Sequence, residues 1–319
     1  MVPTRLTLEP VHAERRPASR ELVVLGTAAQ APTRDRNHNG YVLRWDGRAI
    51  LFDPGEGTQR QLLHAGVPSS SITDICITHF HGDHCLGLPG VLARFALDQR
   101  QHPVDVHYPA SGSEFLDRLR RVAVFEPWPH VRLHPLPLER SVTDLDGLRL
   151  VAEPLEHTVD TLGWRLEEED RRHILPERTD ALGIARRDLG QLARRGWTDV
   201  DGRTVSLDAV SEQRPGQAFA LLMDTGTCDA TVSLARQADL VVCESTYLSD
   251  EVDLAKEKHH LTARQAAWIA AEADARALVL THFSQRHADE SVYAREAAEV
   301  FRNVVAARDL TVVAVPGRA

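Results

Sequence analysis

An apolar segment at 72–78 runs directly into four potential metal ligands, which are His79, His81, Asp83 and His84. Side chains two residues apart on an extended segment point to the same side, so His79 and His81 should share a face. The glycine after His81 permits a sharp turn, which would bring Asp83 and His84 back to the same space. Imidazole and carboxylate groups bind zinc and similar ions, and this run holds more of them than one tetrahedral ion with an open position needs. The run therefore predicts two adjacent metal ions rather than a solvated histidine cluster.

Three further potential ligands, His157, Asp224 and His282, each follow a segment that we expect to be a strand. A single histidine in such a place is more often structural than metal-binding, so spacing alone leaves both interpretations open. Strand ends that meet at one edge of a sheet commonly carry functional side chains. All three residues are therefore candidates for the same site as the histidine run.

Apolar strands alternate with helices along most of the chain. Asp46 and Gly47, between two of the strands, are typical of a hairpin turn. The helix expected at 59–65 stops at Gly66, as helices often do. The other helices are expected at 88–97, 114–122, 262–273 and 292–303, and the strands at 21–25, 41–45, 49–52, 72–78, 104–108, 148–154, 161–166, 218–223, 239–244, 277–281 and 310–315. This alternation predicts an α/β fold.

Residues 167–217 interrupt the alternation with few long apolar runs, many arginines and several turn signals. Within this segment, 171–203 holds eight arginines against five acidic residues, a net charge of +3 in a chain that totals −9. That sign suits contacts with phosphate, although an arginine-rich helical face is often merely solvated. We expect residues 1–20 to be a loosely held N-terminal tail and 21–319 to be one domain, from which 167–217 projects as an arm.

The composition excludes several classes of protein. A net charge of −9 argues against a surface coated with nucleic-acid-binding groups. No apolar stretch approaches the roughly 20 residues of a membrane span, and the charged N-terminus lacks the apolar core of a secretory signal. The chain is therefore expected to be cytoplasmic. Its four cysteines form no Cys-x-x-Cys pair, which argues against a zinc ribbon or a disulfide framework.

The sequence T-H-F-H-G-D-H at 78–84 resembles the H-x-H-x-D-H signature of the metallo-β-lactamase superfamily. Its extension to residue 90 resembles one branch, the ribonuclease Z family of tRNA 3′-processing endonucleases. The run D-P-G-E-G-T-Q-R-Q at 53–61 and the run T-H-F-S-Q-R at 281–286 are similar to more specific motifs of that family. Other segments that resemble its motifs lie at 32–37, 155–157, 163–168 and 260–263.

The resemblance implies a four-layer αβ/βα sandwich with two divalent metal ions, zinc or alternatively manganese, at one edge of its sheets. One ion would be held by His79, His81 and His157, and the other by Asp83, His84 and His282. Asp224 would bridge the two ions. Asp83 also counts as a catalytic residue, because the ions it helps to hold activate the attacking water.

The resemblance also implies roles in proton transfer and substrate binding. Glu244 and His260 match a pair credited with protonating the leaving 3′-oxygen, and a carboxylate can keep an imidazole protonated. Asp53 and Glu56 would orient metal ligands, and Arg286 would contact a backbone phosphate. The substrate would be a tRNA precursor, and the protein a homodimer in which one subunit's arm serves the other's active site.

Two other functions remain open on the sequence. The first is a hydrolase of the same fold that acts on small phosphodiesters or other esters. The second is a metal-binding RNA chaperone or scaffold without catalysis. The second is disfavoured because all the expected ligands and both proton-transfer residues are present.

Overall fold

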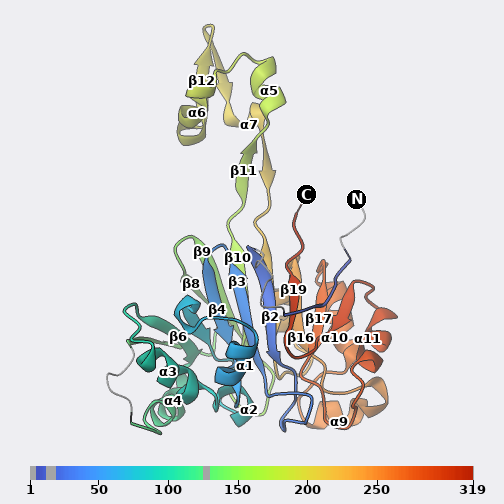
Figure 1. Cartoon of the computed structure of the whole chain (residues 1–319). Helices are drawn as coiled ribbons and strands as arrows, with labels where there is room; N and C mark the ends of the chain where they lie inside the picture. The colour runs from blue at the N-terminus through green and yellow to red at the C-terminus, as the bar shows by residue number, and fades with distance from the viewer. Residues whose placement is uncertain (1–4, 12–18, 125–129, 319) are drawn as a thin grey trace.

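The computed structural model describes residues 5–11, 19–124 and 130–318. Two sheets lie face to face, and helices cover the outer face of each one (Figure 1). The predicted four-layer αβ/βα sandwich is therefore confirmed. The described residues include no helix that is long and apolar enough to cross a membrane.

The first sheet comes from the N-terminal half of the chain and one C-terminal strand. In spatial order its strands are β1 (Glu9–Pro10), β19 (Thr311–Ala314), β2 (Arg20–Gly26), β3 (Gly40–Trp45), β4 (Arg48–Phe52), β5 (Asp74–Cys76), β6 (Val104–Pro109) and β7 (Val131–Leu136). Its outer face packs on α1 (Thr58–His64), α3 (Leu88–Leu97) and α4 (Ser113–Arg120).

The second sheet comes from residues 141–306. In spatial order its strands are β18 (Val304–Ala306), β17 (Leu278–Thr281), β16 (Leu240–Glu244), β15 (Ala218–Leu222), β10 (Thr161–Glu168), β9 (Leu148–Leu155) and β8 (Ser141–Asp144). Its outer face packs on α8 (Asp229–Ala235), α10 (Ala263–Glu272) and α11 (Ser291–Ala298). The strands β15 to β18 are parallel neighbours, so their carboxyl ends lie along one edge.

The core between the two sheets is formed by large side chains that alternate along the strands. Trp45 and Trp164 are fully buried there, and the rings of Phe52 and Phe219 meet across the sheets with centroids 5.7 Å apart. Burial of each such side chain stabilises the fold by about 1.5–3 kcal/mol. This core fixes the two sheets against each other, and with them the loops at the sheet edges.

The expected strands and most expected helices are present, with shifts of one or a few residues at their ends. The helix expected at 292–303 is shorter, because α11 ends at Ala298 and the chain then continues into β18. The strands β7 and β8 were not predicted from the sequence. Both are edge strands whose side chains are half-exposed or exposed. β8 is short and mostly polar, and the alternation in β7 covers only Val131 to His134 before Pro135.

Part of the predicted N-terminal tail belongs to the body instead. Leu6 is buried in the core between the sheets, and β1 pairs with β19 at the sheet edge. The segment is too short to show a strand pattern, and its pairing partner lies at the far end of the chain. The expectation of a loosely held tail is therefore wrong for these residues.

The arm projects far from the body on a two-stranded stalk (Figure 1). The stalk strands are β11 (Arg171–Ile174) and β14 (Ser211–Arg214), which pair in an antiparallel register. A lobe at the tip contains α5 (Pro176–Ala181), α6 (Leu189–Arg195), α7 (Leu207–Val210) and the hairpin of β12 (Trp197–Val200) and β13 (Arg203–Ser206). Ile184, Leu192 and Val210 give the lobe a small core of its own.

Candidate metal centre

The seven predicted metal ligands meet at one edge of the sandwich, at the ends of strands from both sheets. His79 and His81 follow β5, and the next two ligands lie in the short helix α2 (Gly82–Cys85). The remaining three, His157, Asp224 and His282, follow β9, β15 and β17. Figure 1 shows α2 at the end of the body that faces away from the arm. The structure therefore brings all seven residues together, as their places after the strands predict.

Asp224 lies at the centre of the cluster, and its carboxylate faces four histidine rings. Its Oδ2 is 3.5 Å from Nε2 of His79, 3.3 Å from Nε2 of His84 and 3.7 Å from Nε2 of His157. Its Oδ1 is 3.2 Å from Nε2 of His282. The same carboxylate thus borders the group of His79, His81 and His157 as well as the group of Asp83, His84 and His282.

Each of these four histidines is held by its other ring nitrogen. Asp53 accepts a hydrogen bond from Nδ1 of His84 at 2.9 Å, and the carbonyl oxygen of His259 accepts one from Nδ1 of His157 at 3.1 Å. The hydroxyl of Thr78, which donates to Asp53, accepts from Nδ1 of His79 at 2.9 Å. With the proton on Nδ1, Nε2 of a neutral ring presents a lone pair to the centre, as a metal ligand requires.

The fourth histidine is held by a residue that the sequence did not single out. The hydroxyl of Thr246 donates to Glu244 at 2.6 Å and accepts from Nδ1 of His282 at 2.8 Å. Two residues after the end of a strand, a lone threonine carries no signal that separates it from an ordinary loop residue. The sequence cannot single out the carbonyl oxygen of His259 either, since every residue has a backbone carbonyl.

The electrostatics of the cluster differ from ring to ring, because burial lowers the pKa of His79, His81 and His157, whereas that of His84 is raised. Burial lowers the pKa of His84, but the carboxylates of Asp224, Asp83 and Asp53 outweigh it and raise that pKa well above its usual value. Burial raises the pKa of Asp83, yet the neighbouring His84 and His282 outweigh that cost and lower it. Buried carboxylates that remain ionised at this edge would attract a divalent cation.

The ligand atoms themselves fit a cation. Oδ1 of Asp224 and Nε2 of His282 are buried and have no hydrogen-bond partner among the described residues, although they lie 3.2 Å apart. Nε2 of His79 and Nδ1 of His81 face each other at 3.0 Å, and Nε2 of His157 lies 3.3 Å from the same atom of His81. Imidazole nitrogens and a carboxylate oxygen that converge in this way, some of them without a hydrogen-bond partner, are typical of a metal site. The donor set therefore suits divalent metal ions.

Glu244 and His260 form the predicted pair beside the metal ligands. Oε1 of Glu244 accepts a hydrogen bond from Nδ1 of His260 at 2.7 Å, and Glu244 is fully buried. Its carboxylate also accepts from the backbone amide of Thr225 at 2.8 Å, which fixes its orientation. Burial disfavours a charged His260, but Glu244 and then Asp224 outweigh this and raise its pKa to about 9. At neutral pH, His260 is therefore a protonated imidazole whose ring lies 5.4 Å from that of His282.

The remaining predicted residues have different outcomes. Asp53 is fully buried and accepts hydrogen bonds from Thr78 and His84, so it lies where the prediction placed it. The side chain of Glu56 is exposed, and the hydrogen bond described for this residue is made by its carbonyl oxygen. Arg286 is 57% exposed and forms an ion pair with Glu251 at 3.2 Å. The structure thus brings Asp53, but neither Glu56 nor Arg286, into contact with the metal ligands.

A buried arginine and a half-buried carboxylate hold the loops on either side of the site. The guanidinium of Arg36 donates to the carbonyl oxygens of His287 and Ala288 at 2.9 and 3.0 Å, in the loop after His282. The carboxylate of Asp309 accepts from the hydroxyl of Thr27 and the backbone amide of Asn37, at 2.8 and 2.6 Å. These bonds fix the loop at 27–37, whose Gln30 amide donates to Asp83 at 2.8 Å.

Asp309 should make the stability of the protein depend on pH. Burial raises its pKa from 3.8 to about 6 in the folded state, so the folded protein binds a proton that the unfolded chain releases. Its stabilising contribution is complete below pH 3.8 and is lost as the pH rises through about 6. Asp309→Asn, which stays neutral, should therefore melt at a higher temperature than wild type at about pH 8. This increase in melting temperature should shrink as the pH falls towards about 4. An increase that grew on acidification would contradict this account.

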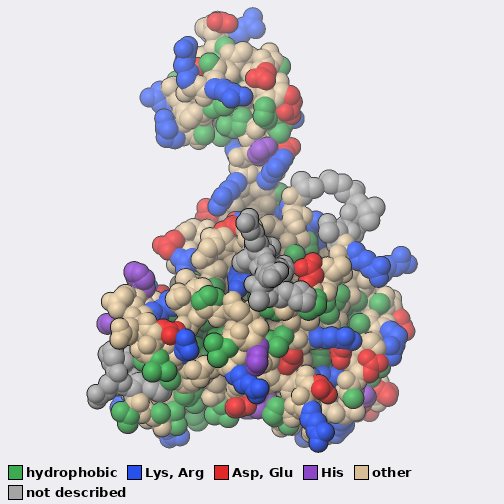
Figure 2. Space-filling view, viewed as in Figure 1, with side chains coloured by type: hydrophobic (Ala, Val, Ile, Leu, Met, Phe, Trp, Pro, Cys, Tyr) green, Lys and Arg blue, Asp and Glu red, His purple; other side chains and the backbone are tan. Residues whose placement is uncertain are grey.

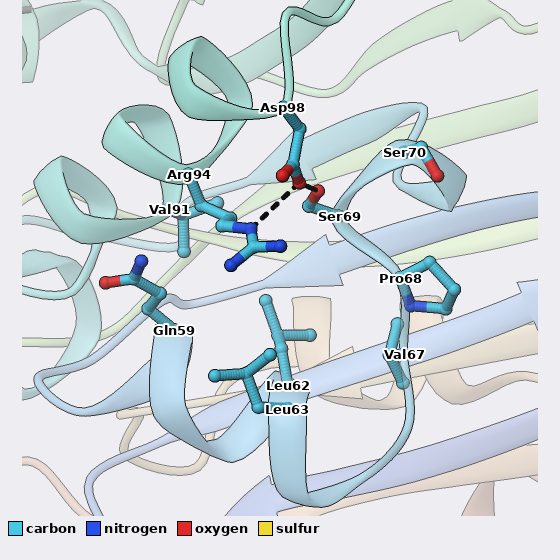
Figure 3. A pocket seen from close by; sticks show the side chains of 10 residues that line it. All are labelled: Gln59, Leu62, Leu63, Val67, Pro68, Ser69, Ser70, Val91, Arg94 and Asp98. Carbon is cyan, nitrogen blue, oxygen red and sulfur yellow. Dashed lines mark hydrogen bonds and ion pairs between the residues drawn. The ribbon is translucent and has the colours of Figure 1, made fainter.

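A small cavity of about 130 Å³ lies elsewhere, between α1 and α3 and beside the 3-10 turn Ser69–Ser71 (Figure 3). Its rim includes Arg94, whose Nε donates to Asp98 at 2.9 Å, and the hydroxyl of Ser69 donates to the same carboxylate. None of the predicted metal ligands or proton-transfer residues lines this cavity. We therefore assign the chemistry to the ligand cluster and not to this cavity.

The chain is similar to proteins of known family over nearly its whole length. Residues 33–176 match the family model described as the metallo-beta-lactamase superfamily. The ribonuclease Z of Salinispora arenicola (strain CNS-205) is 53% identical over 302 residues, which cover 94% of this chain and 98% of that protein. The ribonuclease Z of Nocardia farcinica (strain IFM 10152) is 50% identical over 303 residues, covering 94% of this chain and 99% of that protein.

Solved structures agree with this assignment. Human tRNase Z, short form, superimposes with a TM-score of 0.67 at 26% identity, covering 93% of this chain and 100% of that one. The metallo-beta-lactamase fold protein YhfI from Bacillus subtilis superimposes with a TM-score of 0.66 at 16% identity, covering 92% and 98%, which supports the fold alone. On the identity and coverage of its relatives, the chain belongs to the ribonuclease Z family of the metallo-beta-lactamase superfamily.

Proposed function

We propose that the protein is a metal-dependent endoribonuclease that removes 3′ trailers from tRNA precursors and leaves a 3′-hydroxyl on the tRNA. The observation that carries the chemistry is the convergence of four imidazole Nε2 atoms on the carboxylate of Asp224, with protonated His260 beside them. The substrate follows from relatives about 50% identical over nearly the full chain, which bear the name ribonuclease Z. We place the reaction in the cytoplasm.

The ligand cluster divides into two sets of three residues that share one carboxylate. His79, His81 and His157 would hold one divalent ion, and Asp83, His84 and His282 the other, with Asp224 between them. Zinc suits a set dominated by imidazole, and manganese is the alternative. Bound ions would lower the pKa of water and offset negative charge on the phosphodiester.

The protein's own groups supply orientation and a proton. Asp53, Thr78 and Thr246 hold the ligand rings in fixed tautomers, which keeps their Nε2 atoms directed at the centre. His260 can donate its proton to the 3′-oxygen that leaves when the phosphodiester is cleaved. Glu244 stabilises the protonated ring before the transfer and orients it through Nδ1.

The arm supports a macromolecular substrate and a homodimer. Its stalk leaves the body at the edge opposite to α2, so the arm points away from the metal ligands of its own subunit (Figure 1). An RNA held by the arm would therefore meet the metal centre of a second subunit. The basic character of 171–203 suits contact with the phosphates of that RNA.

This arrangement predicts complementation between two defective variants. Residues 175–210 can be replaced by an Asn-Gly turn, because Ile174 and Ser211 are paired neighbours on the stalk. The armless variant should hydrolyse a small phosphodiester normally, but its KM for a tRNA precursor should rise roughly tenfold or more, since each tenfold corresponds to about 1.4 kcal/mol of lost contact.

Co-expression of the armless chain with Asp224→Ala should restore cleavage of the precursor, because the intact arm of the inactive subunit serves the active one. The matched control is co-expression of the armless chain with a chain that carries both the arm deletion and Asp224→Ala. Precursor cleavage that stayed at the armless level in both mixtures would contradict action between subunits.

The alternative function is hydrolysis of small phosphodiesters or other esters by the same centre. An assay that offers both a 3′-extended tRNA precursor and a small chromogenic phosphodiester distinguishes the two. We expect kcat/KM to be much higher for the precursor. Turnover of the small ester alone would reject the tRNA assignment while leaving the metal chemistry intact.

A further inference from the structure

Two adjoining hollows lie where the arm joins the body. The larger, of about 520 Å³, is lined by residues that precede β16, β17 and β18, among them Arg276, Arg302 and Arg318. The smaller, of about 320 Å³, lies against the stalk and includes Arg171 and Arg214. Arg318 and Pro215 line both hollows, so the two form one continuous depression. We call this depression the arm-root hollow.

The arm-root hollow is rich in positive charge. Among the described residues, its lining includes seven arginines and three carboxylates, in a chain whose net charge is −9. Figure 2 shows Lys and Arg side chains in blue on the stalk where it meets the body, and more of them over the lobe. Lys and Arg side chains thus occur on the body, the stalk and the lobe, with side chains of other kinds between them.

Two of these arginines are fixed in place by one buried carboxylate. Asp239 is fully buried and accepts from Arg276 at 2.9 Å and from Arg318 at 2.9 and 3.0 Å. A single carboxylate therefore pairs with two guanidinium groups, and N–H groups of both remain available to bind an anion. Guanidinium groups that are held in place in this way lose little conformational entropy when they bind a phosphate.

The other arginines of the arm-root hollow differ in their partners. Within the described part of the chain, Arg171 and Arg302 have no ion pair, although Glu168 lies within electrostatic range of Arg171. Arg172 and Arg214 each have one ion pair, and Arg20 has two. Arg171 and Arg214 also stand directly opposite each other on the antiparallel stalk. Like charges in that position destabilise a strand pair, and an anion between them would remove the cost.

We propose that the arm-root hollow is a further binding site for the phosphate backbone of the RNA substrate, separate from the lobe of the arm. This inference rests on the proposed function. The hollow lies on the edge from which the arm leaves, opposite to the subunit's own metal ligands, so RNA held here would also be presented to a second subunit. Its arginines would contact phosphates and not bases, and would strengthen binding without selecting sequence.

The test is the salt dependence of tRNA binding, measured with full-length protein and a 3′-extended precursor. Arg171→Gln with Arg302→Gln is the informative double variant, because neither residue has an ion pair whose loss would disturb folding. We expect a roughly tenfold weaker Kd at low salt. The slope of log K against log salt should fall by about 1.8, which is about 0.9 for each lost phosphate contact.

Arg60→Gln with Arg120→Gln removes the same charge from α1 and α4, and should leave the salt slope close to that of wild type. Turnover of a small phosphodiester should be unchanged in both double variants, which shows that they are folded. An unchanged Kd and slope in the arm-root variant would overturn the proposal, as would an equal loss in the control. Binding is measured separately from cleavage, so failure of wild type to cleave any precursor would count against the proposed function and not against this site.

Discussion

Asp224→Ala is expected to abolish hydrolysis of both tRNA precursors and small phosphodiesters, and to strip the protein of bound metal. The Asp224 carboxylate faces four ligand rings at 3.2–3.7 Å and borders both sets of ligands. Its removal should lower activity by more than the roughly 10–100-fold that follows loss of a group behind a metal ligand. Metal content by mass spectrometry and kcat/KM for both substrates are the measurements.

A second variant separates loss of the ligand from loss of the fold. Asp224 has a backbone φ of +40°, which asparagine tolerates better than alanine. Asp224→Asn should therefore melt close to wild type and still lose metal. Asp229→Asn, at an exposed position nearby on α8, should keep both metal and activity. Full metal content and activity in Asp224→Asn would show that this carboxylate is not a ligand.

His260→Ala is expected to lower kcat for tRNA precursors by roughly 10²–10⁴-fold while metal content is retained, because the leaving oxygen loses its proton donor. A small phosphodiester whose leaving group is a stable phenolate needs no such proton, so its turnover should fall far less. The contrast between the two substrates distinguishes proton donation from a general defect. Equal losses on both would reject the assigned role.

Glu244→Gln tests the electrostatic part of the same pair. Glu244 is the main neighbour that raises the pKa of His260 to about 9, and His260 acts in its protonated form. Activity of wild type should therefore decline as the pH rises through the pKa of His260. Without the carboxylate that pKa falls, and the basic limb of the pH–rate profile should move to lower pH. A basic limb that stayed in place would show that another group titrates there.

The sequence predicted seven candidate metal ligands from the histidine run, from the strands that precede the other three residues, and from the resemblance to a family. Among the groups that hold these side chains it predicted Asp53 but not the others. Thr246 and the carbonyl oxygen of His259 become visible only when loops distant in the sequence meet. The sequence likewise could not show that Arg286, a candidate for phosphate binding, forms an ion pair with Glu251.

Backbone strain at the site was also beyond the sequence. Asp53, Asp224 and His282 all have positive φ, at +44°, +40° and +59°, and none of them is glycine. Such conformations cost free energy and persist only where the surrounding packing enforces them. Here β4 and β17 end immediately before Asp53 and His282, and β15 ends two residues before Asp224, so the sheet edges impose the geometry that aims each side chain. For the arm, the polar sequence predicted an insertion, but it did not predict the small core of the lobe.

The most direct test of the central claim is cleavage of a 3′-extended tRNA precursor by metal-depleted protein to which zinc or manganese is added back, with both product ends mapped. We expect no cleavage without metal. With metal, we expect one cut after the discriminator nucleotide that leaves a 3′-hydroxyl on the tRNA and a 5′-phosphate on the trailer. Cleavage that persists without metal, or metal-loaded protein that hydrolyses small esters and leaves the precursor whole, would contradict the account.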